Sequence, residues 1–314
     1  MRLSARLIAA ATFGGLLGAV PLTAADAGTT APVRQGTIAT QAAGPSGITA
    51  KGAYLYDASK GEKLWGRATT TQRPIGSITK VMTAVVVLRA GHLDRQVTVK
   101  KSYVGHVRGN DATSAGLRAG DKVTVRQLLN GMLLPSGCDA AYALADVYGP
   151  GQTKFIAKMN KTAASLGMKQ THFVDSDGLP TSSRKEGYST PHDLVSLARY
   201  AMKSSDFRAV VARRTYKLAT GSGHHAYRWT NTNLLLGSYS GTIGIKTGHT
   251  DAAGYCLLFA AKRGSRTLIG LLLNSTTTDP NRRFKNAATM LDWGFRTKSA
   301  QLRLRSLPAG TPTD

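Results

Sequence analysis

The chain has 314 residues, 42% of them hydrophobic, and its 41 basic and 17 acidic side chains give a formal net charge of +24. The apolar content is typical of a globular protein, and the length suits one large domain or two lobes that share a core. Such a charge is common in nucleic-acid-binding proteins, but the basic residues form no run interleaved with aromatic residues. We therefore expect no nucleic-acid partner.

Residues 1–27 have the pattern of a secretory signal peptide. Arg2 and Arg6 supply the positive start, residues 7–20 the apolar middle, and residues 25–27 an A-x-A cleavage site. A membrane anchor is the alternative, but the apolar run is too short to cross about 30 Å of hydrocarbon. We expect a secreted, extracytoplasmic protein that associates with the cell wall. A basic protein in that compartment would meet an anionic cell envelope.

The remaining chain divides by composition. Residues 28–46 are rich in Ala, Thr, Gly and Pro without periodicity, which predicts a flexible linker. One domain is expected over residues 47–300, and residues 301–314 are expected to form a basic polar tail. We expect the protein to be a monomer.

The predicted elements run from strands to helices and back to strands. Two strand-like runs around a glycine-containing turn predict a hairpin, and apolar residues at helical spacing then predict several helices. The expected elements are strands at 52–57 and 62–65, helices at 77–89, 124–134, from 139, 152–166 and from 191, strands at 242–248, 255–261 and 267–273, and a helix at 283–293. Strands at both chain ends imply one sheet built from the two ends and an inserted helical lobe.

Ser77 and Lys80 stand at the start of the first of these helices. Residues three apart on a helix are neighbours on one face, so Lys80 can serve as the base that a serine nucleophile needs. The helix N-terminus also favours negative charge developing at Ser77. An ordinary N-cap serine would give the same local pattern. A second copy of this spacing, Ser182 to Lys185, lacks the apolar helix behind it and is interpreted as a chance match.

Two further motifs follow in order: Ser136-Gly137-Cys138 at a helix junction and Lys246-Thr247-Gly248 at a strand end. With Ser77-x-x-Lys80 they resemble the three motifs of the penicillin-recognising serine enzymes. The residues around Ser77, the run 188–191 and the run 246–250 are similar to the D-alanyl-D-alanine carboxypeptidase and transpeptidase family, and most of all to the small secreted transpeptidases of actinomycetes. The resemblance covers essentially all of the chain after the signal peptide.

This resemblance implies an α/β (α+β) fold of the β-lactamase/transpeptidase type, with an antiparallel sheet flanked by helices and an inserted all-helical lobe. It implies that Ser77 attacks a peptidoglycan stem peptide ending in D-Ala-D-Ala, that an acyl-enzyme forms, and that β-lactams acylate the same serine. Lys80 would be the base, with burial and the charge of Lys246 lowering its pKa, and Ser136 would relay a proton to the leaving amine. No cofactor or metal is implied.

The resemblance also implies a set of substrate-binding residues. Lys246 and Thr247 would hold the terminal carboxylate of the substrate, with Gly248 and Thr250 beside them. The backbone N–H groups of Ser77 and His249 would form the oxyanion hole, where each donor is commonly worth about 3 kcal/mol.

Cys138 departs from the family's common pattern, which ends the second motif in Asn. A thiol is a weak donor and acceptor, so substrate positioning and the balance between hydrolysis and aminolysis are open. In the implied fold Cys256 lies one strand behind Lys246, across a cleft from Cys138, too far for a disulfide, which needs Cα atoms within about 7 Å. We expect two separate thiols, with Cys256 buried and Cys138 open to the cleft.

Two other functions remain as alternatives. A serine β-lactamase has the same fold, but group-A enzymes deacylate through a glutamate-held water. The only glutamates here are Glu62 and Glu186, and neither stands in an E-x-x-L-N pattern. A non-catalytic wall-binding protein is the alternative of another class; the presence of both Ser77 and Lys80 speaks against it. The pair His224-His225 is too sparse for a zinc site.

Overall fold

The computed structural model describes residues 44–110, 112–180, 186–298 and 301–311. The predicted signal peptide and nearly all of the predicted linker lie outside these ranges, as does the second Ser-x-x-Lys copy at 182–185. All described residues belong to one compact unit, Ala43–Asp314. In the described ranges, no helix has both the length and the apolar character needed to cross a bilayer.

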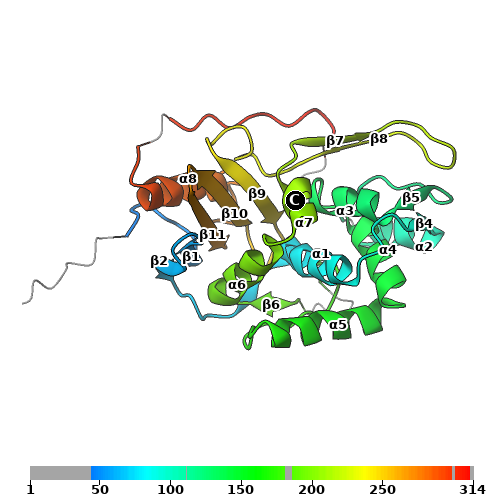
Figure 1. The fold of residues 1–314 in the computed structure, drawn as a ribbon, viewed down its shortest axis with the longest axis horizontal. Coiled ribbons are helices and arrows are strands. Elements are labelled where there is room, and N and C mark those ends of the chain that lie inside the picture. The colour runs from blue at the N-terminus through cyan, green and yellow to red at the C-terminus, as the bar shows by residue number, and fades with distance from the viewer. Residues whose placement is uncertain (1–43, 111, 181–185, 299–300, 312–314) are drawn as a thin grey trace, which may run out of the picture. The chain divides into compact units, whose positions relative to one another are not determined.

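A five-stranded antiparallel sheet combines strands from both ends of that unit (Figure 1). Its order is β2-β1-β11-β10-β9. The last strand of the chain, β11, therefore pairs with β1 of the first hairpin, and β9 forms the opposite edge of the sheet. The strands are β1 (Gly52–Asp57), β2 (Glu62–Arg67), β9 (Thr242–Gly248), β10 (Cys256–Arg263) and β11 (Arg266–Leu273). The predicted sheet is confirmed, including β9 at its edge with β10 next to it.

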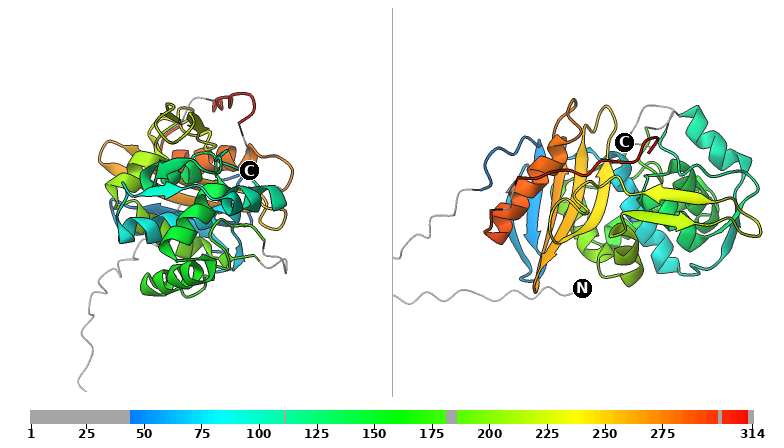
Figure 2. Two further views of the ribbon diagram at one scale, coloured as in Figure 1. Left: turned by 90° about the vertical axis from the view of Figure 1, so that its right-hand side faces the viewer. Right: turned by 90° about the horizontal axis from the view of Figure 1, so that it is seen from above.

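Both faces of the sheet are covered. Along β10, Leu257 and Phe259 belong to the apolar cluster on the side of α8 (Arg282–Phe295), whereas Leu258 and Ala260 belong to the cluster on the other side. That other side is covered by α6 (Pro191–Ala201), which packs on β1 and β11, while α8 packs on β10 and β11 (Figure 2). Side chains on both faces of the strand are therefore buried, which explains the near-continuous apolar runs in the sequence.

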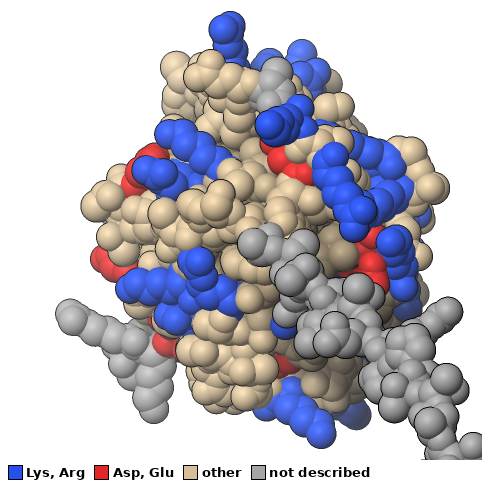
Figure 3. Space-filling view, turned by 90° about the vertical axis from the view of Figure 1, so that its left-hand side faces the viewer, with Lys and Arg blue, Asp and Glu red and all other residues tan. Residues whose placement is uncertain are grey.

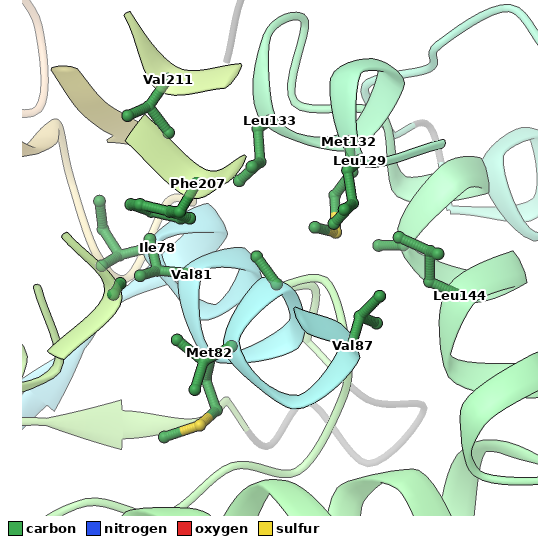
Figure 4. Packing of buried hydrophobic residues seen from close by; sticks show 14 of the residues in the cluster. Ile78, Val81, Met82, Val87, Leu129, Met132, Leu133, Leu144, Phe207 and Val211 are labelled. Carbon is green, nitrogen blue, oxygen red and sulfur yellow. The ribbon is translucent and has the colours of Figure 1, made fainter. Parts of the chain in front are cut away.

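The central helix is α1 (Thr79–Ala90), preceded by a short 3₁₀ turn, η1 (Gly76–Ile78). Every residue from Gly76 to Val87 is buried. The helices around it are α2 (Lys101–Gly109), α3 (Val125–Leu133), α4 (Cys138–Tyr148), α5 (Gln152–Ser165) and α7 (Ser205–Val211). Figure 4 shows side chains of α1 meeting Leu129, Leu144 and Phe207 from three of these helices. This packing holds the η1–α1 junction rigidly between the sheet and the helical lobe.

The helix predicted at 124–134 is confirmed as α3, and its start is fixed because Thr124 and Gln127 form a reciprocal capping box. Two helices, α2 and α7, were not predicted. Within α2 only Tyr103 is buried, so its sequence carries little apolar periodicity. Three short strand pairs were also missed: β3 (Arg73–Pro74) with β6 (Tyr188–Ser189), β4 (Gln96–Thr98) with β5 (Lys122–Thr124), and β7 (Thr215–Leu218) with β8 (Tyr227–Thr230).

The last described segment, residues 301–311, packs against the domain. Leu302 and Leu304 join the apolar cluster under α8. Arg305 donates from Nε to the carbonyl of Leu236 at 2.9 Å and from Nη2 to the carbonyls of Asn231 and Asn233. The described part of the predicted tail is therefore held by specific main-chain contacts.

Candidate active site

Ser77 and Lys80 face each other across the first turn after Gly76. Lys80 Nζ donates to Ser77 Oγ at 2.8 Å, and the two residues are only 0% and 8% exposed, respectively. Ser77 lies in η1 and Lys80 in the first turn of α1, so the local helical geometry alone creates this contact. The hydroxyl and the amine that the first motif predicted are within direct proton-transfer distance.

Two glycines let other segments approach this serine closely. Gly76 has φ +50°, and a Cβ there would lie 3.2 Å from backbone atoms of His249. Gly178 has φ +89°, and a Cβ there would lie 2.1 Å from the carbonyl oxygen of Gly76 and 2.7 Å from the nitrogen of Ser77. The site is thus enclosed by backbone on two sides, and a side chain at either position would push that backbone away.

Lys80 has further partners on distant segments. Its Nζ donates to the main-chain carbonyl of Asp177 at 2.5 Å and to Cys138 Sγ at 3.3 Å. Cys138 is 1% exposed, and burial raises the pKa of its thiol to about 12. The expectation of a thiol open to the cleft is therefore wrong. The Cys138 side chain contacts the lysine instead of standing where it could receive a substrate.

A second amine–hydroxyl pair is formed by Lys246 and Ser136. Lys246 Nζ donates to Ser136 Oγ at 2.9 Å, and it also lies 3.3 Å from Thr247 Oγ1. All three side chains are buried, and Ser136 adopts φ +69°, a strained conformation that turns it toward β9. Thr247 Oγ1 lies 2.7 Å from Thr232 Oγ1. The second and third motifs thus meet as predicted.

The other predicted substrate-binding residues lie at the end of β9. Gly248 packs against the η1 turn, where a Cβ would lie 3.0 Å from the carbonyl of Ile75. The His249 ring stacks on Tyr255 with centroids 4.1 Å apart, which leaves its backbone beside Gly76. Thr250 Oγ1 donates to Glu186 Oε2 at 2.9 Å, so its hydroxyl is engaged within the protein.

Sequence reasoning missed several residues that touch the motifs. Thr232 contacts Thr247, Asp177 contacts Lys80, and Arg283 donates to the carbonyl of Gly248 at 3.2 Å. None of them belongs to one of the three motifs. Thr232 and Asp177 lie in loops, for whose paths the sequence offers no signal, whereas Arg283 lies at the start of α8, a helix that was predicted without a contact to β9.

Cys138 and Cys256 are not joined by a disulfide bond, as predicted, and both are buried. Cys256 pairs with Gly248 across β9 and β10, one strand back from the site. Among the residues that the structure describes, no group of three or more His, Cys, Asp or Glu is placed to hold a metal ion. The site contains two pairs of a serine and a buried lysine, Ser77 with Lys80 and Ser136 with Lys246. A serine with a base within hydrogen-bonding distance is the arrangement that nucleophilic acyl transfer requires. Fold and site together define a serine enzyme of the penicillin-recognising class.

Comparison with known proteins identifies the family. Residues 38–277 match the family described as D-alanyl-D-alanine carboxypeptidase (peptidase S11). The chain is 46% identical over 260 residues to the D-alanyl-D-alanine carboxypeptidase of Streptomyces sp. (strain K15), covering 79% of this chain and 88% of that protein. It is 37% identical over 244 residues to a D-alanyl-D-alanine carboxypeptidase of Mycobacterium tuberculosis, covering 77% of this chain and 80% of that protein. The chain belongs to the D-alanyl-D-alanine carboxypeptidase family.

Solved structures agree with this assignment. The crystal structure of the Streptomyces K15 DD-transpeptidase matches with a TM-score of 0.75 and 47% identity, over 81% of this chain and 99% of that chain. The D-alanyl-D-alanine carboxypeptidase from Mycobacterium tuberculosis matches with a TM-score of 0.72 and 34% identity, over 84% and 96%. The predicted fold class is therefore confirmed.

Proposed function

We propose that this serine D-alanyl-D-alanine peptidase acts through an acyl-enzyme on Ser77, formed with peptidoglycan stem peptides that end in D-Ala-D-Ala. The observation that carries the proposal is the 2.8 Å contact between Ser77 Oγ and Lys80 Nζ, both withdrawn from solvent. Attack by Ser77 on the penultimate D-Ala carbonyl releases D-alanine. Water or an amine then takes the acyl group, giving carboxypeptidase or transpeptidase activity.

Lys80 is the proposed general base. As an ammonium, Lys80 donates a hydrogen bond to Ser77 Oγ. As a neutral amine, it can accept the Ser77 proton across the same contact. Burial favours this neutral form because desolvation penalises charge. The Cys138 thiol stays protonated beside it and so does not compete as an anion.

Ser136 and Lys246 are proposed to serve the leaving group and the substrate carboxylate. Ser136 Oγ lies 2.9 Å from Lys246 Nζ, so a proton can pass through this hydroxyl to the departing amine. Thr247 and the positive charge of Lys246 are suited to a terminal carboxylate at the same end of the site. The backbone N–H groups of Ser77 and His249 are proposed as the oxyanion hole, with His249 held close by Gly76.

A β-lactamase activity is not favoured by the two glutamates. Glu62 is exposed on β2 beside Lys60, and Glu186 accepts a hydrogen bond from Thr250. The hydrogen bond from Thr250 and the ion pair with Lys60 turn these carboxylates to partners other than Ser77. We therefore expect β-lactams to act as covalent inhibitors that leave slowly.

We further propose that the protein is exported by the signal-like segment 1–27 and works as a monomer at the anionic cell envelope. The motivation is the segment's composition and the net charge of +24. N-terminal sequencing of secreted material should find a start near Gly28; retention of Met1 in a membrane fraction would speak for an anchor.

The experiment that tests the catalytic proposal is incubation with labelled penicillin, followed by mass spectrometry of the adduct site. We expect a long-lived adduct on Ser77 in the wild type and none in Ser77→Ala. Lys80→Arg keeps the charge but cannot supply a neutral amine, so its acylation should fall by orders of magnitude while the fold persists. Labelling that survives Ser77→Ala, or an adduct that turns over within seconds, would refute the proposal.

A further inference from the structure

A segment between α5 and β6 reaches Lys80 from outside all three motifs. Asp177 accepts from Lys80 Nζ through its main-chain carbonyl, and the preceding carbonyl, of Ser176, accepts from Thr83 Oγ1 at 2.6 Å. Lys80 and Thr83 lie one turn apart on the same face of α1. The central helix therefore holds this segment at two successive carbonyls.

The Asp177 side chain is held from the opposite direction. Its Oδ2 accepts from His106 Nε2 of α2 at 2.6 Å, and its Oδ1 accepts from the Leu179 N–H at 3.1 Å. The His106 ring lies against the ring of Tyr142 of α4, with centroids 4.3 Å apart and the ring planes tilted by 32°. His106 is 21% exposed, whereas the Asp177 side chain is 2% exposed. One residue thus gives its carbonyl to the proposed base and its carboxylate to an imidazole.

The charge of Asp177 bears on the protonation of Lys80. Burial acts to raise the pKa of the Asp177 carboxyl, but the hydrogen bond from His106 and the charge of Lys80 outweigh it and hold this pKa below its ordinary value. An ionised carboxylate beside a lysine favours the ammonium over the neutral amine. A base must be neutral to accept a proton. A cation on His106 would offset the carboxylate and restore the neutral amine.

Other titratable groups stand near this lysine. They are Cys138 and Asp139 at the start of α4, Asp175 and Asp177 in the segment after α5, and Lys246 of β9 across the site, bonded to Ser136. The Cys138 thiol, with a pKa of about 12, does not titrate near neutral pH. Asp175 does, because burial and then the charge of Asp177 raise its pKa to about 7. Its contribution must be separated in any measurement.

We propose that His106 and Asp177 are positioning residues for Lys80. In this arrangement Asp177 aims its carbonyl at the ammonium, and His106 hydrogen-bonds the carboxylate and offsets its charge when protonated, so that the pair sets the pH above which Lys80 can activate Ser77. This inference rests on the proposed function, in which Lys80 is the base. It adds a second pair of groups, on α2 and on the segment after α5, to a site otherwise built from the three motifs.

The test is the pH profile of acylation by labelled penicillin, measured between about pH 5 and pH 9 across the titration of the base. His106→Gln cannot carry a positive charge and should move the acidic limb to higher pH by about one unit, with an approximately tenfold loss of rate on that limb. His106→Lys keeps a cation that can face Asp177, so its limb should stay close to that of the wild type. Asp177→Asn keeps the main-chain carbonyl but removes the charge and should move the limb to lower pH.

Opposite shifts for the two partners are not expected of a purely structural defect. His224→Gln, a change on a histidine outside the site, serves as control, and every variant is repeated with Asp175→Asn to remove the titration near pH 7. Profiles of His106→Gln that superimpose on the wild type, or equal shifts for His106→Gln and His106→Lys, would overturn the inference. If Asp177→Asn does not fold, the two His106 variants decide. A wild type without an adduct on Ser77 would overturn the proposed function itself and this inference with it.

Discussion

The carboxyl of Asp175 shows how burial and a neighbouring charge set the protonation of one residue. Its Oδ1 accepts the N–H groups of Asp177 and Gly178, while its buried Oδ2 has no hydrogen-bond partner among the described residues. A negative charge on this oxygen would be buried without a hydrogen bond to stabilise it, so the neutral, protonated carboxyl is favoured. The raised pKa, about 7, has this physical cause together with the nearby charge of Asp177.

This carboxyl predicts a pH dependence of stability. Because its folded-state pKa of about 7 lies above the ordinary value of 3.8, its contribution to the free energy of unfolding is fully present below about pH 4 and is lost as the pH rises through 7. The slope from this one group is on the order of 1 kcal/mol per pH unit inside that window. Asp175→Asn cannot titrate, so urea unfolding at pH 5, 6, 7 and 8 should show a flatter profile and a variant at least as stable as the wild type at pH 8. An unchanged slope would contradict the prediction.

Between elements, the segment 175–179 comes close to η1 at Gly178. Gly178 lies against Gly76 and Ser77, and its positive φ of +89° allows this contact without a side chain in the way. The same segment supplies the carbonyl for Lys80. The position of a loop after α5 therefore fixes η1, where the nucleophile lies, and the first turn of α1, which carries Lys80.

We expect Gly178→Ala to damage both stability and acylation. Its Cβ would lie 2.1 Å from the carbonyl oxygen of Gly76, and the free energy of unfolding should fall by about 3 kcal/mol or more, from backbone strain and this clash together. Acylation of Ser77 should fall at least tenfold as the backbone near its N–H moves. Urea unfolding and penicillin labelling measure the two effects.

Gly91→Ala is the matched control. Gly91 has φ +74° and ψ −147°, a conformation that residues other than glycine rarely adopt, but a Cβ there would meet nothing within 4 Å, so only backbone strain of about 1–3 kcal/mol is expected. Acylation should be unaffected. Equal losses in the two variants would show that conformation, not the approach to Gly76, governs Gly178.

At the scale of the whole molecule, the chain end is tied to the site through one loop. Arg305 donates to the carbonyls of Asn231, Asn233 and Leu236. Within that loop Thr232 lies 2.7 Å from Thr247 of β9, and its N–H donates to the carbonyl of Leu134 before the Ser136 turn. The last described segment thus supports the loop that joins the second and third motifs.

Arg305→Ala should lower the free energy of unfolding by about 2 kcal/mol, because it removes charge-assisted hydrogen bonds and leaves main-chain carbonyls without this donor. Arg303→Ala, an exposed neighbour with the same charge change, should cost less than about 0.5 kcal/mol. Urea unfolding of both variants gives the comparison. Equal values would mean that the segment contributes only through its charge.

The remaining basic side chains act over longer distances. On the face shown in Figure 3, Lys and Arg lie in several separate groups with acidic side chains among them, and they do not form one continuous stripe. A net charge of +24 spread in this way suits general attraction to an anionic surface, which affects encounter and location and is weakened by salt.

The three motifs and the elements that carry them could be predicted from the amino-acid sequence. Ser77 and Lys80 meet through helical spacing, and β9, β10 and β11 are marked by apolar runs, because both patterns arise from residues close together in the chain. Only the tertiary structure decided that Cys138 turns toward Lys80, that Asp177 supplies a carbonyl to Lys80 from 97 residues away, and that His106 stands behind it. Such contacts depend on how loops cross between packed elements. The path of a loop produces no periodic pattern in the sequence. It is determined by the packing of the helices and the sheet that the loop connects.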